Sequence, residues 1–129
     1  MVLYVLPGEP VALSRPRTNF TERRVYNSQR NCMTSSSIHL QSQHNSLKMY
    51  DGPLHLEATF YFPYPKNFPK SKREGVNYKT TRCDLDNLIK FICDISNGIL
   101  YADDATIVSI SAKKVYADKP RTEFTITSL

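Results

Sequence analysis

The sequence predicts a small single domain of the α+β class, in which a mixed or antiparallel sheet carries one principal helix. Three observations support this fold. Residues 54–62 alternate between apolar and polar side chains, as a half-buried strand does. Residues 85–97 repeat apolar side chains at helical spacing, and residues 106–112 and 122–129 alternate again. At 129 residues the chain has the length of one domain with its own core, so we assign residues 1–129 to it.

The N-terminal part contains weaker signals. Residues 2–6 form a short apolar run ended by Pro7-Gly8, which predicts a first strand. Arg15-Pro16-Arg17 is expected to be extended, because proline disfavours helix in the residue before it. Residues 27–47 are mostly polar, and a helix there is one alternative to irregular chain.

The strand predicted at residues 54–62 ends at Pro63, and a basic loop follows it. Residues 63–82 hold three prolines and six Lys or Arg against a single acid, Glu74. This composition predicts a solvated, mobile loop. Five of its basic residues are candidate contacts to DNA: Lys70, Lys72, Arg73, Lys79 and Arg82.

The helix predicted at residues 85–97 has both a start and a stop signal. Asp84 stands at the N-cap position, and Asn97-Gly98 forms the stop. Its apolar stripe, which should face the sheet, consists of Leu85, Leu88, Ile89, Ile92 and Ile95.

The charge distribution favours a polyanionic partner. The formal net charge is +5, yet five of the twelve acids lie within residues 84–104. Sixteen of the seventeen Lys and Arg residues lie outside this window. A basic body around a compact acidic patch suits a nucleic acid whose backbone must meet a cation. A protein with uneven surface charge and no such partner is the alternative.

Other classes of protein are disfavoured. No apolar run approaches the ~20 residues that span a bilayer, so we expect an intracellular protein without a membrane contact. Cys32, Cys83 and Cys93 form no CxxC pair and lack zinc-type spacing to the histidines, so reduced thiols are expected.

The acidic patch has the residue types of a metal-dependent phosphodiesterase. Asp84 and Asp86 begin the predicted helix, Lys90 follows one turn later, and Asp103-Asp104 precede a strand. Carboxylates are the ligands that Mg²⁺ and Mn²⁺ prefer, and a lysine can neutralise charge in the transition state. The same aspartates could instead cap a helix, pair with Lys90 or form a turn, so spacing alone leaves both interpretations open.

The ordered set of motifs resembles the RusA family of Holliday junction endonucleases. The matching residues are, in order, Asp84-Leu-Asp-Asn-Leu-Ile-Lys90, Asp94, Gly98, Tyr101-Ala-Asp-Asp104, Ile107-Val108, and a later lysine at Lys113 or Lys114 followed by Tyr116. Gly8-Glu-Pro10 and Arg15-Pro-Arg17 resemble the N-terminal elements of the family. Arg82-Cys83 departs from the pattern, because the family usually has a basic residue and proline there.

The resemblance implies a Mg²⁺-dependent homodimer, with Mn²⁺ as an alternative ion, that nicks opposing strands of a four-way DNA junction in recombination and repair. It implies Asp84, Asp86 and Asp104 as metal-binding catalytic acids, Lys90 as the catalytic lysine and Asp103 as an assisting acid. It also implies DNA contacts by Arg15 and Arg17, to which we add Lys113.

One geometric question stays open at this stage. The predicted helix is about 20 Å long, and Asp104 lies six residues beyond its end, so Asp104 could return to the helix start only along a nearly straight path. Alternatively, the carboxylates meet across a dimer interface.

Three alternative functions compete with a junction resolvase. The first is a nuclease for other branched DNA, such as forks or flaps. The second is a nucleic-acid-binding module without chemistry, in which Tyr61, Tyr64 and Tyr78 stack on bases. The third is a glycosyltransferase that binds its ion through Asp84 and Asp86, which the short chain disfavours.

Overall fold

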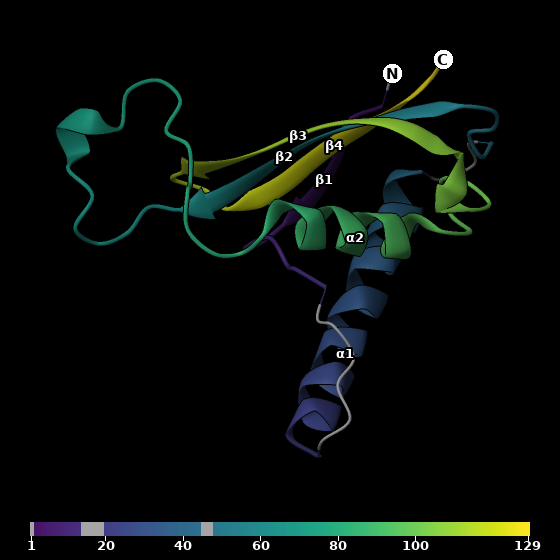
Figure 1. The fold of residues 1–129 in the computed structure, drawn as a ribbon, viewed down its shortest axis with the longest axis horizontal. Helices are drawn as coiled ribbons and strands as arrows, with labels where there is room; N and C mark the ends of the chain where they lie inside the picture. The colour runs from purple at the N-terminus through teal and green to yellow at the C-terminus, as the bar shows by residue number, and fades with distance from the viewer. Residues whose placement is uncertain (1, 14–19, 45–47) are drawn as a thin grey trace.

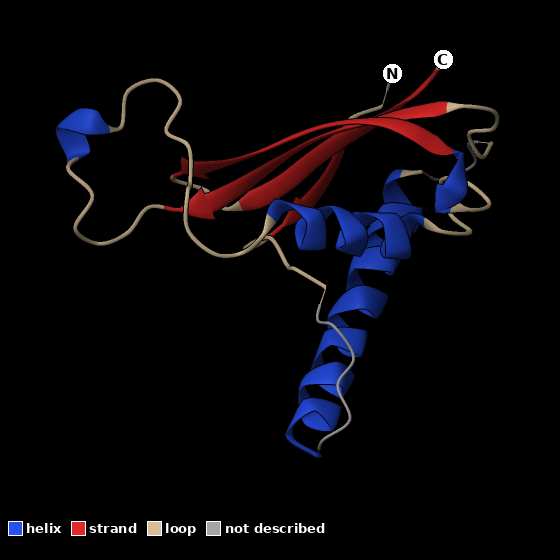
Figure 2. Ribbon diagram, in the orientation of Figure 1, coloured by secondary structure: helices blue, strands red, loops and turns tan. Residues whose placement is uncertain are grey.

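The computed structural model describes residues 2–13, 20–44 and 48–129, with the backbone alone for residues 20–31. Its main elements are β1 (Tyr4–Pro7), α1 (Phe20–Gln43), β2 (Leu54–Pro63), α2 (Leu85–Ser96), β3 (Ile107–Ala117) and β4 (Arg121–Ser128). Figure 1 and Figure 2 show one sheet with both helices on the same side of it. The predicted α+β class is confirmed.

The sheet is mixed, and its strand order is β1-β4-β2-β3. β4 runs antiparallel to β1 and β2, whereas β2 and β3 are parallel. A parallel pair needs a long crossover, and the chain from β2 to β3 supplies it with α2. The predicted alternation in β2 is confirmed, since the buried residues are Leu54, Leu56, Ala58, Phe60 and Phe62.

α2 buries three residues of its predicted apolar stripe: Leu88, Ile92 and Ile95. The other two, Leu85 and Ile89, are half-buried, and Phe91, which the predicted stripe does not include, is buried. The helix ends at Ser96, and Gly98 follows with a φ of 79°. The Gly98 N–H donates to the carbonyl of Tyr101 at 2.7 Å. The chain therefore turns at the predicted stop signal and leads into Asp103-Asp104.

The Gly98→Ala substitution is expected to lower the free energy of unfolding by about 1 kcal/mol, because a Cβ disfavours positive φ. A Cβ at residue 98 would meet no atom within 4 Å, so the cost comes from the backbone conformation and not from a clash. Urea unfolding measures the change. An unchanged free energy of unfolding would contradict this account of the turn.

α1 is longer than the possible helix at residues 27–47 and begins at Phe20. Its C-terminal end is held by specific contacts to β1. The Gln43 side-chain amide binds both the N–H and the carbonyl of Val5, each at 2.7 Å. Nδ1 of the buried His44 lies 2.7 Å from the hydroxyl of Tyr4. Burial and the neighbouring Tyr50 raise the pKa of the Tyr4 hydroxyl, which therefore stays neutral. The two hydrogen bonds of Gln43 to Val5 cover the free edge of β1 at that residue.

β3 is also longer than predicted, because it continues past residue 112 to Ala117. It is an edge strand, and two backbone hydrogen bonds attach the segment before α2 to its outer side. The Lys79 N–H donates to Lys114 at 3.0 Å, and the Tyr116 N–H donates to Asn77 at 2.9 Å. No helix among the described residues is both long and apolar enough to cross a membrane.

Candidate active site

The first acidic pair lies at the N-terminal end of α2, and both carboxylates are exposed. Asp84 is at the predicted N-cap position, with φ −70° and ψ 139°, but its side chain makes no capping hydrogen bond. Asp86 Oδ1 accepts the neighbouring N–H of Asn87 at 3.0 Å. Because Asp84 is not used as a helix cap, its carboxylate is available to another ligand.

The second acidic pair lies in the turn between α2 and β3. Asp103 Oδ1 accepts the Ala105 N–H at 3.3 Å and caps the short 3-10 helix Asp104–Thr106. The pKa of the Asp104 carboxyl is raised, first by a hydrogen bond with Asp103, then by burial and by the charges of Asp103 and Asp94. Asp94 and Asp103 therefore make the surroundings of the Asp104 carboxyl negative near the C-terminal end of α2.

Asp94 is the residue of this cluster that sequence reasoning did not assign to the site. Its spacing from Asp86 and Lys90 predicts only a shared helix face. The proximity of Asp94 to Asp104 arises because Gly98 folds the chain back beside the last turns of α2. A reversal directly after a helix that carries an acid near its end is the sequence signal that could have indicated it.

The two acidic pairs lie at opposite ends of α2. The helix has 12 residues and is therefore about 18 Å long. Asp84 and Asp86 lie at its start, whereas Asp104 interacts with Asp94 and Cys93 near its end. Within the described part of the chain, no three His, Cys, Asp or Glu side chains lie close enough together to hold a metal ion. One chain alone therefore does not bring Asp84, Asp86 and Asp104 together.

Lys90 lies between the two acidic pairs, on the exposed side of α2. The alternative that it forms ordinary ion pairs with its acidic neighbours finds no support here. Among the described residues, ion pairs join Arg73 to Asp118 and Arg121 to Glu123, and neither involves Lys90. Its ammonium is thus exposed on the surface that carries the acids.

The basic loop is solvated, as its composition predicts, since most of its residues are exposed, but part of it is anchored by ring contacts. Tyr64, Phe68 and Tyr116 form a ring cluster with centroids 4.8 to 5.8 Å apart. The Arg73 guanidinium lies 4.5 Å from the centre of the Tyr64 ring. The Lys79 ammonium lies 5.1 Å from the centre of the Phe62 ring. Aromatic and cation–π contacts therefore give the loop a defined shape.

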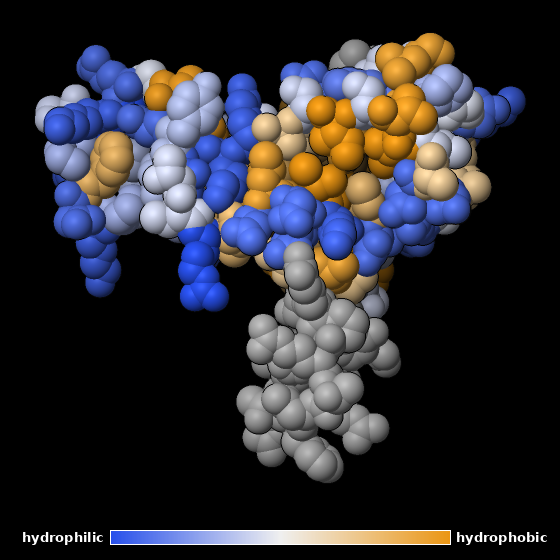
Figure 3. All heavy atoms as spheres, in the orientation of Figure 1, coloured by the Kyte–Doolittle hydropathy of each residue, from blue (hydrophilic) through white to orange (hydrophobic). Residues whose placement is uncertain are grey.

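Within this loop the predicted DNA contacts divide into two groups. Lys70, Lys72 and Arg82 are exposed, as is Lys113 on β3, so they are free to meet a phosphate. Arg73 and Lys79 already engage rings, and Arg73 also pairs with Asp118 at 3.5 Å. Figure 3 shows the loop as a hydrophilic lobe beside the sheet. The predicted contacts Arg15 and Arg17 lie outside the described residues.

The three tyrosines considered as a stacking surface do not form one. Tyr61 is half-buried, with the Arg121 guanidinium 3.7 Å from its ring centre. Tyr64 belongs to the ring cluster, and Tyr78 is the exposed member of the three, at 63%. A continuous aromatic platform for bases is therefore absent from this set.

All three cysteines are free thiols, as the sequence predicts. Burial raises the pKa of the Cys93 thiol to about 11, so it stays protonated at neutral pH. Cys83 is half-buried at the entry to α2.

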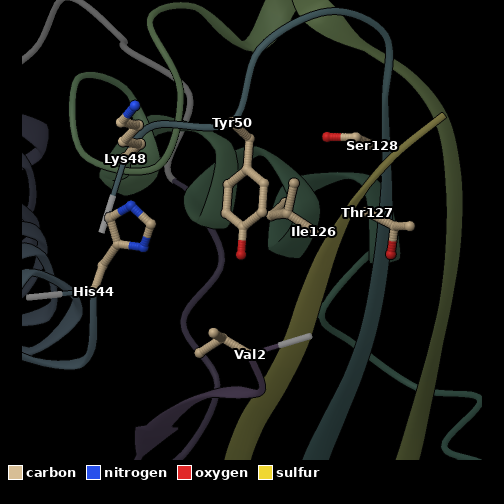
Figure 4. A pocket seen from close by; sticks show the side chains of 7 residues that line it. All are labelled: Val2, His44, Lys48, Tyr50, Ile126, Thr127 and Ser128. Atoms are coloured by element: carbon tan, nitrogen blue, oxygen red, sulfur yellow. The ribbon is translucent and has the colours of Figure 1, made fainter. Parts of the chain in front are cut away.

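A surface hollow of about 430 Å³ lies between the end of α1, the segment before β2 and the end of β4. In Figure 4 the Tyr50 ring stands across this hollow, beside His44 and Ile126. The hollow contains none of the predicted site residues, since its lining consists of Val2, His44, Lys48, Tyr50, Ile126, Thr127 and Ser128.

Comparison with known proteins identifies the family. The family model described as "Endodeoxyribonuclease RusA" matches residues 7–127. The chain is 30% identical over 136 residues to the "Uncharacterized protein YqaN" of Bacillus subtilis (strain 168), covering 97% of this chain and 94% of that protein. It is 40% identical over 78 residues to the "Crossover junction endodeoxyribonuclease rusA" of Lactococcus phage r1t, covering 60% of this chain and 56% of that protein. With a family match over nearly its whole length, the chain belongs to the RusA family of Holliday junction endonucleases.

Proposed function

We propose that this protein is a Mg²⁺-dependent homodimeric endonuclease that resolves four-way DNA junctions by paired, symmetric nicks. Membership of the RusA family supports the junction as substrate. The observation that supports metal dependence is that the Asp84 carboxylate is exposed and makes no capping hydrogen bond, and that the exposed carboxylate of Asp86 follows two residues later. A protein that only bound DNA would gain nothing from carboxylates on a phosphate-binding surface.

The chemistry of the donor set fits a hard divalent cation. Asp84, Asp86 and Asp104 would hold the ion, because all three supply carboxylate oxygens and none is buried. The raised pKa of Asp104 supports this assignment, since its hydrogen bond with Asp103, its partial burial and the charges of Asp103 and Asp94 make a negative charge on Asp104 unfavourable without a cation. When bound, the ion would polarise the scissile phosphate and favour attack by water.

Lys90 would act on the phosphate. Its ammonium is exposed on the same helix side as the acids, one turn after Asp86. A positive charge there stabilises the charge that develops on the phosphate oxygens during attack. The exposed Lys70, Lys72, Arg82 and Lys113 would bind the flanking backbone and thereby hold the duplex arms in position.

The separation of the acidic pairs supports a dimer in which each site is shared. β3 is an edge strand, and Val108 and Ile110 on it are 63% and 47% exposed. Figure 3 shows apolar surface between β3 and α2. An exposed apolar edge strand is suited to pairing with a second copy.

A two-fold axis at this edge would complete the metal site. Figure 1 shows α2 and β3 running in opposite directions side by side. If β3 pairs antiparallel with its counterpart, the partner's α2 runs opposite to the first α2. Asp84 and Asp86 of the partner subunit then lie at the end that carries Asp104. Two equivalent sites result, as paired nicks require.

Product mapping tests the proposed function. The protein is expected to nick a synthetic four-way junction at symmetric positions on two opposing strands in Mg²⁺, and to leave linear duplex of the same sequence intact. A fork and a flap serve as alternative substrates. Faster cleavage of a fork or flap than of the junction would favour the second candidate, a nuclease for other branched DNA. Junction binding without cleavage in Mg²⁺ or Mn²⁺ would contradict the nuclease assignment.

A further inference from the structure

We infer that Lys114 is a positioning residue for Asp84 and Asp86, because its ammonium fixes the segment through which the chain enters α2. This inference rests on the proposed function of those two acids. Lys114 Nζ donates to the carbonyl oxygen of Thr81 at 2.7 Å and to that of Cys83 at 2.7 Å. The second of these carbonyls belongs to the residue directly before Asp84.

The register of the sheet explains why Lys114, and not its neighbour, makes these contacts. Lys114 is opposite Phe60 of β2, whose side chain is buried on the helix side of the sheet. Lys113 is opposite Thr59 and therefore points to the other side, where it is exposed. Only Lys114 can reach the segment below the sheet that leads into α2.

The contacts of Lys114 complete a series of attachments along the preceding segment. Backbone hydrogen bonds fasten Asn77 and Lys79 to β3. The Lys79 ammonium donates to Thr81 Oγ1 at 2.8 Å. Between Lys79 and α2, no backbone hydrogen bond to β3 is found among the described residues. In this stretch the Lys114 ammonium provides the attachment to β3, through the carbonyl oxygens of residues 81 and 83.

A DNA contact is the alternative role for a lysine in a basic protein. A lysine that binds phosphate has its three N–H donors directed to solvent. Lys114 is half-buried and uses two of its donors on main-chain oxygens. Its primary effect is therefore on the geometry of the chain at Asp84. Metal sites tolerate displacements of only about 0.5 Å in their ligands, so a loosened helix entry would weaken the site.

The Lys114→Met variant tests the inference, because methionine keeps an unbranched stem and removes the ammonium. We expect the single-turnover cleavage rate at saturating junction to fall roughly 10- to 100-fold, with a higher Mg²⁺ concentration needed for half-maximal rate. Junction affinity measured in Ca²⁺ should change less than about threefold, since the phosphate contacts remain. Lys114→Gln keeps a shorter hydrogen-bond donor, so its saturated cleavage rate should lie between those of the wild type and Lys114→Met. It replaces the methionine variant if that variant fails to fold.

Lys119→Met is the matched control, because it removes the same charge from an exposed lysine that follows the end of β3. Its saturated rate should stay within about twofold of wild type. A Lys114→Met or Lys114→Gln protein that cleaves at the wild-type saturated rate, with unchanged Mg²⁺ dependence, would overturn the inference. A purely structural role of Lys114 would lower the melting temperature and leave the saturated rate of the folded fraction unchanged. That result would also overturn the inference.

Amide hydrogen exchange separates this inference from the proposed function. Lys114→Met is expected to speed exchange in residues 81–88 and to leave the sheet protected. If the wild-type protein cleaves no junction, the proposed function fails, but faster exchange confined to residues 81–88 still supports the role of Lys114 at the helix entry. Unchanged exchange in residues 81–88 would reject it whatever the activity.

Discussion

The Asp84→Asn substitution is expected to lower junction cleavage in Mg²⁺ by on the order of 10²- to 10³-fold or more. The amide keeps the size of the side chain and removes the negative charge that would bind the cation. Asp84 is exposed and makes no capping hydrogen bond, so the fold should be unaffected. Removing a negative charge from a DNA-binding surface should leave junction affinity unchanged or raise it. Single-turnover cleavage and binding in Ca²⁺ measure the two effects.

Asp51→Asn is the matched control for this prediction. Asp51 is an exposed acid in the turn before β2, and it belongs to neither acidic pair. Its cleavage rate should remain within about twofold of the wild-type rate, as is usual for surface changes away from a site. A wild-type cleavage rate in Asp84→Asn would remove this residue from the catalytic set and, with it, the main support for metal dependence.

The sequence predicts those elements of the fold whose own residues carry a strong period. β2, α2 and β4 begin and end within about two residues of their expected positions, because each buries one face of a regular pattern. α1 is less predictable because its residues are mostly polar. Its position depends on the contacts of Gln43 and His44 with β1, which are distant in the sequence.

The end of β3 shows a second limit of sequence reasoning. Lys113 and Lys114 interrupt the apolar alternation, so the strand is predicted to end before them. In the structure they lie within β3, and the parallel pairing with β2 continues to Ala117. The tertiary environment overrides local pattern here, because the Lys114 ammonium has carbonyl partners in the segment before α2.

The candidate site is predictable in its residues and not in its assembly. Motif order selects Asp84, Asp86 and Asp104, whose roles stay predictions. The distance between them depends on where Gly98 turns the chain, and that turn keeps Asp104 at the far end of α2. Sequence alone left two paths open for Asp104, and the direct path back to the start of the helix is not the one taken.

Mixing two inactive variants is expected to restore cleavage if each site is shared between subunits. Asp84→Asn and Asp104→Asn should each be nearly inactive as homodimers. In a heterodimer of the two, one site combines both substitutions. The other combines an intact Asp84 and Asp86 from one chain with an intact Asp104 from the other, so it retains every carboxylate. Random exchange makes about half of the dimers heterodimers, so the mixture should regain about a quarter of the wild-type nicking capacity.

The products of the mixture provide an internal check. A heterodimer with one intact site should nick a single strand of each junction, and paired nicks should be rare. Mixing Asp84→Asn with Asp86→Asn is the control, because both substitutions then lie at the same end of α2 and no site in the heterodimer is intact. Persistent inactivity of the first mixture, with subunit exchange verified by tagged chains, would exclude the shared site. The control mixture should stay inactive, because Asp84 and Asp86 of any one site come from the same chain, at the start of its α2. Every site of that heterodimer therefore carries one of the two substitutions.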